Sequence, residues 1–257
     1  MFKMLKKKSL LLICLSLVLF LIFAFTFSSC VVTQNINYTS SSPLKGSSKT
    51  DLQVYDFFVG VVEDMYSWSD DKGDPIIDVA ISNFSENLSK TDYAYSVNFK
   101  PVEDNKYLGT FGFTDFQKLI KQLSSDYPDQ DLITINETSS YKELKLNISL
   151  SNYDVLCKIV PFLAEESFMV WGPIYNNPPY DYLTEDDYKE LVSFILGEDG
   201  PESIDNSSVT IHLSLPAGMK IQLTNGKKIG NGEVEFTFPL IDFLLLHKPI
   251  TFYVRFN

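Results

Sequence analysis

The first thirty residues constrain this chain most, because they join a positive start, a long apolar run and a cysteine. Residues 1–9 contain four lysines and no acidic residue, and residues 10–27 form an uncharged apolar stretch. Ser28, Ser29 and Cys30 follow directly. A positive segment, an apolar segment and small residues before a cleavage point define an export signal. Residues 1–29 are therefore predicted to be a signal peptide, so that the mature chain begins at Cys30.

The cysteine after two small residues changes the expectation from simple secretion to lipidation. The Cys30 thiol would receive a diacylglyceryl group, cleavage would free its amine, and a fatty acid such as palmitate would acylate that amine. Several buried acyl chains anchor a protein stably, whereas a single chain binds a bilayer marginally. Phe27 and Ser29 depart from the commoner Leu and Gly or Ala at those positions. The predicted partner is a membrane lipid bilayer, held through this N-terminal lipid anchor.

Two alternatives to lipidation stay open at the N-terminus. The apolar run of residues 10–27 is close to the shortest length that spans a bilayer as a helix, so it could remain as an uncleaved signal anchor. The chain could also be cleaved and secreted without a lipid.

The charge of the mature chain argues against a nucleic-acid partner. Loss of the four lysines in residues 1–9 takes the formal net charge from −12 to −16. Arg255 is the only arginine, so the bidentate phosphate contacts that arginine provides are unavailable. Phosphate backbones repel such an acidic chain.

The sequence predicts a tether followed by one folded domain. Residues 39–50 are rich in Ser, Gly, Pro and Lys, which is typical of a loop or tether, although residues 32–38 alternate like a short strand. We therefore predict a lipidated N-terminus and tether over residues 30–50 and a single domain over residues 51–257. Residues 52–68 are ambiguous, because strand-like alternation gives way to helical spacing.

Hydrophobic spacing and turn residues predict several helices and several hairpin-forming strands. Helices are predicted after the Asp74–Pro75 cap, after Thr114, over 152–164 with a break at Pro161, over 184–197 with a Thr184–Asp187 capping box at its start, and over 240–246. Strands are predicted over 93–99, 107–113, 132–137, 142–150, 209–215, 219–223, 234–238 and 250–256. Hairpins grouped apart from helices favour an α+β domain, in which a mainly antiparallel sheet packs with several helices.

No pattern of residues predicts a metal, a cofactor or a catalytic set. His212 and His247 lack metal-ligand spacing, and the chain contains no nucleophile elbow and no phosphate-binding glycine loop. Cys157 lies on an apolar helical pattern, which favours a small buried hydrophobic residue over a nucleophile. A non-enzymatic domain is the expectation.

Acidic residues offer one enzymatic alternative, a hydrolase that uses carboxylates. Asp181 and residues 185–187 surround a predicted helix start, where carboxylates are stabilised without any ligand. Asp70, Asp71 and Asp74 lack the order of a calcium loop. Glu165 and Glu166 would act as a catalytic pair only if folding placed another acidic residue opposite them.

Residues 169–183 have the character of a binding surface. Their prolines prevent regular structure throughout, and their aromatic side chains include Trp171, Tyr175, Tyr180 and Tyr182. Such residues can line a groove or form a rigid surface for a lipid or an envelope-protein partner. The alternative is a loop whose aromatic side chains cover the core.

Four stretches resemble a family of uncharacterised spirochaetal (Treponema-like) lipoproteins, which is distantly similar to bacterial LppM-type lipoprotein domains. These stretches are FGFTDFQKLIKQL, LSNYDVLCKIVPFLAEESF, YLTEDDYKELVSFILGEDGP and the segment from SSVTIHLSLP to FYVRF. They are packing and turn motifs, so the resemblance implies a lipid-anchored envelope domain and transfers no active site. It also implies an alternative function, a lipid- or glycolipid-binding module, although the acidity of this chain opposes anionic headgroups. The expected location is a bacterial membrane, with the domain periplasmic or surface-exposed.

Overall fold

The structure is a computed structural model that describes residues 30–54, 59, 76–164, 169, 171–180, 182–198 and 200–257. Several predictions lie outside the described residues. These are the signal of residues 1–29, the calcium-loop question at residues 70–74, the Asp74–Pro75 cap, most of the ambiguous segment after Val54, the Glu165–Glu166 pair and Asp181.

The predicted α+β class is confirmed, with two sheets where the sequence suggested one. The large sheet has the order β3-β4-β2-β1-β7-β10-β9, and the small sheet has the order β5-β6-β11-β8. The large sheet contains β1 (Val31–Ser41), β2 (Leu44–Gln53), β3 (Ala94–Glu103), β4 (Lys106–Phe113), β7 (Ser208–Ser214), β9 (Lys227–Lys228) and β10 (Glu233–Pro239). The small sheet contains β5 (Ile133–Glu137), β6 (Lys142–Ile148), β8 (Ile221–Thr224) and β11 (Ile250–Phe256). The described strand pairs are antiparallel except β1 with β7, which run parallel.

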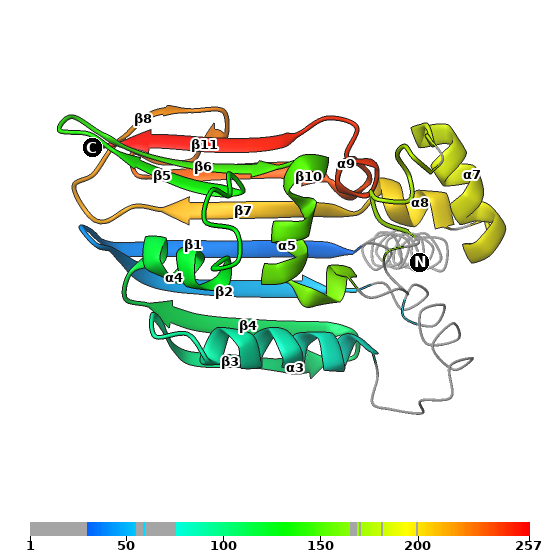
Figure 1. The fold of residues 1–257 in the computed structure, drawn as a ribbon, viewed down its shortest axis with the longest axis horizontal. Helices are drawn as coiled ribbons and strands as arrows, with labels where there is room; N and C mark the ends of the chain where they lie inside the picture. The colour runs from blue at the N-terminus through cyan, green and yellow to red at the C-terminus, as the bar shows by residue number, and fades with distance from the viewer. Residues whose placement is uncertain are drawn as a thin grey trace, which may run out of the picture.

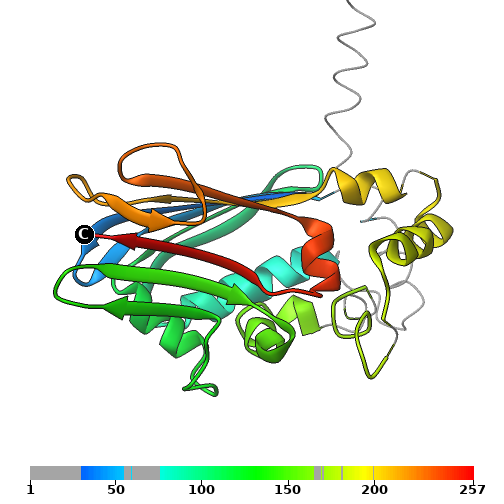
Figure 2. The ribbon, with the colours of Figure 1, turned by 90° about the horizontal axis from the view of Figure 1, so that it is seen from above.

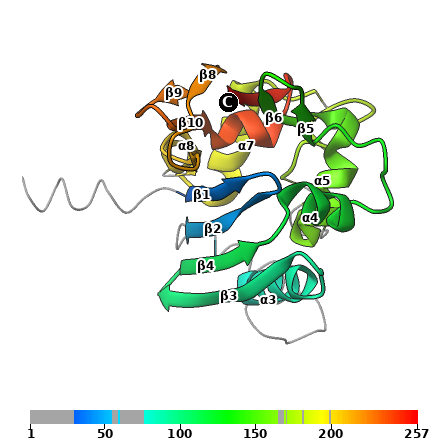
Figure 3. The ribbon, with the colours of Figure 1, turned by 90° about the vertical axis from the view of Figure 1, so that its left-hand side faces the viewer.

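The helices lie mainly on one side of the large sheet and at one end of it. The α-helices of the described residues are α3 (Ile76–Ser89), α4 (Phe116–Leu123), α5 (Tyr153–Ile159), α7 (Glu185–Leu196), α8 (Gly200–Asp205) and α9 (Leu240–Leu245). The first three lie in front of the large sheet in Figure 1 and beneath it in Figure 2. Seen along the strands, they share that side with β5 and β6 (Figure 3).

The loop or tether predicted for residues 39–50 is instead part of a hairpin in the middle of the large sheet. β1 and β2 pair from Val31↔Gln53 to Ser41↔Leu44. Along β2, Leu44, Gly46 and Ser48 are buried, while Lys45, Ser47 and Lys49 are exposed. The polar composition that suggested a loop therefore belongs to the solvent-facing side of a strand.

Gly46 shows why this strand needs a small residue. A Cβ atom at Gly46 would lie 2.1 Å from the carbonyl oxygen of Asn37 and 3.0 Å from the ring of Phe113. The glycine therefore allows the close approach of β1 and an aromatic core residue, which a longer side chain would prevent.

Aromatic and aliphatic side chains from both sheets form the main core. Its members include Tyr38, Leu44, Phe113, Phe116, Leu213, Val234, Phe252, Val254 and Phe256. The rings of Phe236 on β10 and Phe252 on β11 stack with centroids 4.9 Å apart and an interplanar angle of 14°. Since β10 and β11 belong to different sheets, this stack joins the sheets at their seam.

Most predicted helix boundaries are close to the observed ones. The Thr184–Asp187 capping box forms, and α5 ends before Pro161, which begins a short 3₁₀ turn (Pro161–Ala164). The cap of α4 is Asp115 rather than Thr114, because the Asp115 carboxylate accepts a hydrogen bond from the Lys118 amide at 3.1 Å. The sequence pattern did not predict α8.

The helices α7, α8 and α9 gather with residues 171–180 beyond the end of the sheet at which β1 begins, and we call this region the helical end (Figure 1). A separate buried cluster holds it together, formed by Trp171, Tyr188, Val192, Ile204, Ile241, Leu244 and Leu245. Burial of each large apolar side chain stabilises the fold by about 1.5–3 kcal/mol. The helical end is therefore a packed part of the domain.

Candidate functional site

Cys30 lies directly at the start of β1, a central strand of the large sheet. Its amide donates a hydrogen bond to the Ser207 hydroxyl at 2.8 Å, and its carbonyl accepts one from the Ser208 amide at 3.1 Å. The Cys30 side chain is partly exposed and packs beside the buried cluster of Val54, Ile77 and Tyr107. The residue predicted to carry the lipid is thus fixed to the junction of α8 and β7, with no spacer before the sheet.

The four aromatic residues predicted to form a binding surface have different roles in the structure. Trp171 is 6% exposed and belongs to the core of the helical end, as the alternative interpretation expects. Its carbonyl accepts hydrogen bonds from the Tyr188 hydroxyl and the Asn176 side-chain amide, both at 3.1 Å. Trp171 is therefore too deeply buried to form part of a surface.

Tyr175 and Tyr180 pack against each other on one side of the loop. Their rings stack with centroids 4.6 Å apart and an interplanar angle of 27°. Tyr180 is 54% exposed, while Tyr175 is half-buried. This pair presents an aromatic surface to solvent.

Two buried asparagines that the sequence analysis did not single out hold this loop in place. The Asn176 side-chain amide donates to the carbonyls of Trp171 and Leu244, at 3.1 and 3.0 Å. The Asn177 amide donates to the carbonyls of Pro173 and Leu245, at 2.8 and 2.6 Å. Both side chains therefore tie the loop to the end of α9, and the Asn-Asn-Pro-Pro run was the only sequence signal for them.

Tyr182 stacks on His247, a residue far from it in sequence. The ring centroids are 4.4 Å apart with an interplanar angle of 14°, and Tyr182 is 60% exposed. One ring face of Tyr182 covers the imidazole. The structure thus brings a predicted surface residue to a histidine whose sequence context showed only the lack of a metal-ligand spacing.

His247 also lines an open hollow at the seam between the sheets, which we call the seam hollow. Its volume is about 600 Å³. The walls come from Phe236, Thr237, Phe238 and Pro239 of β10, Asp242 and Leu245 of α9, Glu185 of α7, and residues 247–251. The hollow therefore combines apolar surface with carboxylates, an imidazole and the Lys248 amine. A second open hollow, of about 420 Å³, lies among residues 215–220 and 230–233.

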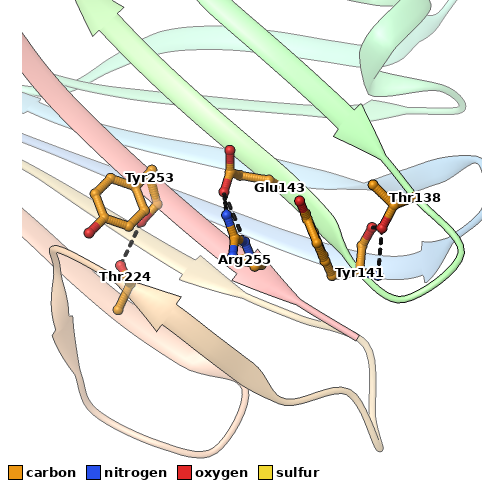
Figure 4. Close-up of polar contacts among 6 residues, drawn as sticks. All are labelled: Thr138, Tyr141, Glu143, Thr224, Tyr253 and Arg255. Atoms are coloured by element: carbon orange, nitrogen blue, oxygen red, sulfur yellow. Dashed lines mark hydrogen bonds and ion pairs between the residues drawn. The ribbon is translucent and has the colours of Figure 1, made fainter.

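Arg255, the only arginine, is engaged by neighbouring side chains on the outer face of the small sheet (Figure 4). Its Nε and Nη2 atoms donate to Oε2 of Glu143 at 3.0 and 2.8 Å. The guanidinium carbon lies 4.2 Å from the centroid of the Tyr141 ring. The hydrogen bonds to Glu143 raise the pKa of Arg255. Much of its charge is therefore balanced within the sheet.

The acidic residues at the start of α7 act as structural partners. The Asp187 carboxylate accepts hydrogen bonds from the Thr184 amide and hydroxyl, at 2.9 and 2.6 Å, which lowers the pKa of Asp187. Lys189 pairs with Glu185 at 2.7 Å and with Asp205 at 2.6 Å. In the part of the chain that the structure describes, no Asp or Glu is buried.

The remaining candidate residues provide little chemistry. His212 faces Glu235 at 3.6 Å on the open side of the large sheet. Burial raises the pKa of the Cys157 thiol to about 11, with a further contribution from the Asp154 charge, so little thiolate forms at neutral pH. Within the described ranges, no group of three or more His, Cys, Asp or Glu side chains is placed to hold a metal ion. None of the helices described has the length and apolarity needed to cross a bilayer.

Comparisons with known proteins return a distant structural similarity. The chain matches no known protein family, and no curated protein matches it significantly. Among solved structures, it is similar to the folded domain of the LppM protein of Mycobacterium tuberculosis, determined by NMR. The two share 11% sequence identity with a TM-score of 0.39, and the match covers 89% of each chain. The resemblance to spirochaetal lipoproteins stays a prediction.

Proposed function

We propose that this chain is a lipid-anchored protein of the bacterial envelope, whose folded region is a non-enzymatic binding or structural module held directly at the membrane surface. The observation that carries the proposal is the continuity of Cys30 with β1. A flexible tether of n residues would allow a reach of about 5–6 Å × √n. With no tether, lipidation at Cys30 would hold the domain at the bilayer.

The mass of the mature protein tests the anchor. We expect protein extracted from membranes to begin at residue 30 and to carry the added mass of diacylglyceryl and acyl groups. Cys30→Ala should remove that mass and prevent cleavage, whereas Cys157→Ala should change neither. An unmodified residue 30, or a residue 30 still joined to residues 1–29, would refute the proposal.

A second candidate function is the binding of an uncharged glycolipid headgroup in the seam hollow. The observation that favours it is the Tyr182–His247 stack beside a hollow of about 600 Å³ that offers hydrogen-bonding groups next to apolar walls. Ligand pockets typically have volumes of about 300–1,000 Å³ and a few polar groups on an apolar lining. The carboxylates of Glu185 and Asp242 disfavour an anionic headgroup.

Paired tyrosine variants test this second candidate. Tyr182→Ala removes the exposed stacking partner of His247, whereas Tyr95→Ala removes a 46% exposed tyrosine that lies over Gly112. We expect micelles of a neutral glycolipid to shift NMR signals of the residues lining the seam hollow. Tyr182→Ala should weaken that shift and Tyr95→Ala should preserve it. Equal binding by both variants, or stronger binding of phosphatidylglycerol, would contradict a neutral-sugar site.

A further inference from the structure

The helical end exposes more aromatic surface than its packing requires. Phe194 on α7 is 89% exposed, and Tyr180 and Tyr182 are 54% and 60% exposed. Tyr188 and Val192 of the same helix are buried, and helical geometry places residue 194 on the opposite side of α7. Phe194, Tyr180 and Tyr182 together give the helical end a set of exposed aromatic side chains, and exposed apolar surface of this kind marks an interaction site.

Cys30 is connected to this surface through a short series of contacts. Its amide binds the Ser207 hydroxyl, which in turn donates to the carbonyl of Ser203 in α8 at 2.7 Å. Helix α8 packs on α7 through the buried cluster that contains Ile204 and Val192. The start of β1 and helix α7 therefore belong to one packed end of the molecule (Figure 1).

We propose that the helical end is the part of the molecule that lies on the lipid bilayer, with Phe194 inserted at the interface and Tyr180 and Tyr182 adding further aromatic contacts. This inference rests on the proposed lipidation of Cys30. Because no spacer separates Cys30 from the sheet, an anchored domain keeps this end close to the membrane. Anchoring makes the contact intramolecular, so a few weakly binding side chains are enough to orient the domain. Tyrosine is also enriched where proteins meet the headgroup region.

Charge selects the kind of bilayer that fits this face. The described residues of this part of the chain carry one lysine, Lys189, among seven acidic residues: Glu185, Asp186, Asp187, Glu190, Glu198, Glu202 and Asp205. An anionic surface would repel them, and salt would screen that repulsion. We therefore expect the lipid surface that contacts the helical end to be zwitterionic or uncharged.

Site-specific labels on the lipidated protein test the orientation. In a Cys157→Ser background, a single cysteine is introduced by Phe194→Cys, Leu223→Cys or Lys49→Cys and coupled to an environment-sensitive fluorophore. Leu223 belongs to β8 at the far end of the molecule, and Lys49 lies on the open side of the large sheet. Each protein is reconstituted in phosphatidylcholine vesicles that contain nitroxide-labelled lipids. We expect a blue shift and a loss of most fluorescence for the label at position 194, and neither change at the two control positions.

Each result of this experiment has a defined meaning. Replacing part of the phosphatidylcholine by phosphatidylglycerol should reduce quenching at position 194, and added salt should restore it. Equal quenching at positions 194 and 223 in protein whose lipidation is confirmed by mass would refute the orientation while leaving the anchor intact. Stronger quenching at position 49 would place the open sheet face on the bilayer and would also overturn the inference. Absence of lipid on Cys30 would refute the proposed function itself.

Discussion

The Tyr38 hydroxyl is an unusual buried group, because its removal should stabilise the protein. Tyr38 is 1% exposed, and its hydroxyl has no hydrogen-bond partner among the described residues. Its ring packs edge-on against Phe113 and Phe116, with centroids 5.6 and 5.8 Å away. Tyr38→Phe keeps these ring contacts and removes only the hydroxyl.

The size of the effect follows from two opposing contributions. Burial of a hydroxyl without a partner costs about 1–3 kcal/mol, which Tyr38→Phe would recover. Loss of the oxygen removes a few van der Waals contacts of about 0.1–0.2 kcal/mol each. We therefore expect Tyr38→Phe to raise the free energy of unfolding by about 1 kcal/mol.

Tyr188→Phe is the matched control. Tyr188 is also 1% exposed, but its hydroxyl donates to the Trp171 carbonyl at 3.1 Å. Removal of that hydrogen bond should lower the free energy of unfolding by about 1 kcal/mol. The same chemical change should thus have opposite signs at two equally buried positions.

Urea denaturation followed by circular dichroism measures both effects, provided that the m-values of the variants agree.

Burial raises the pKa of Tyr38 above the unfolded value near 10. Because the pKa of Tyr38 is raised in the folded state, its ionisation does not change the free energy of unfolding below the unfolded pKa and lowers it as the pH rises from the unfolded pKa through the folded pKa. Tyr38→Phe should therefore lose less stability than wild type at alkaline pH. A loss of stability comparable to that of Tyr188→Phe at neutral pH would show that the Tyr38 hydroxyl has a partner.

Four further predictions concern the cap of α7, the Cys157 thiol and Arg255. Thr184→Ala should destabilise the protein by about 1 kcal/mol in thermal or urea unfolding, because it removes the cap of α7. The pKa of Asp187 is lowered in the folded state, so its contribution to the stability of the fold is present above the unfolded pKa and is lost as the pH falls through the folded pKa. Asp187→Asn should therefore make the free energy of unfolding depend less on pH in acid. Alkylation of Cys157 should be slow at pH 8 and should accelerate toward pH 11, and a fast reaction at neutral pH would contradict its burial. Arg255→Lys should lower the free energy of unfolding, because lysine cannot reproduce two N–H contacts to Glu143; a double-mutant cycle with Glu143→Gln that shows no coupling would contradict this.

The sequence predicted local features well, because their causes lie within a few residues. The capping box at Thr184 and Asp187, the break at Pro161 and the short helix at residues 240–245 all depend on neighbouring side chains or on backbone chemistry. The polar strand β2 was missed, because its exposed Lys and Ser residues resemble a loop until the buried positions between them are known. The division into two sheets was also missed, since no local pattern specifies which hairpins pair.

Much of the candidate site depends on contacts between distant residues. The stack of Tyr182 on His247 and the hydrogen bonds from Asn177 to the end of α9 join segments that are more than sixty residues apart. Composition identified residues 169–183 as unusual but did not separate the buried Trp171 from the exposed tyrosines. The sequence also did not predict the exposure of Phe194, because α7 has apolar residues on more than one side.

The position of β1 also determines when this molecule can complete its fold. β1 is the first strand of the described chain, yet its parallel neighbour β7 begins at Ser208. A protein that crosses a membrane in extended form emerges N-terminus first. β1 could then pair with β2 early, but its other neighbour, β7, would follow only after about four-fifths of the chain had passed. Contacts of such long sequence separation form slowly. In the export that we propose for this chain, the large sheet would thus be completed late, and a chaperone that shields β1 and β2 from other exposed strand edges would have its greatest effect during this interval.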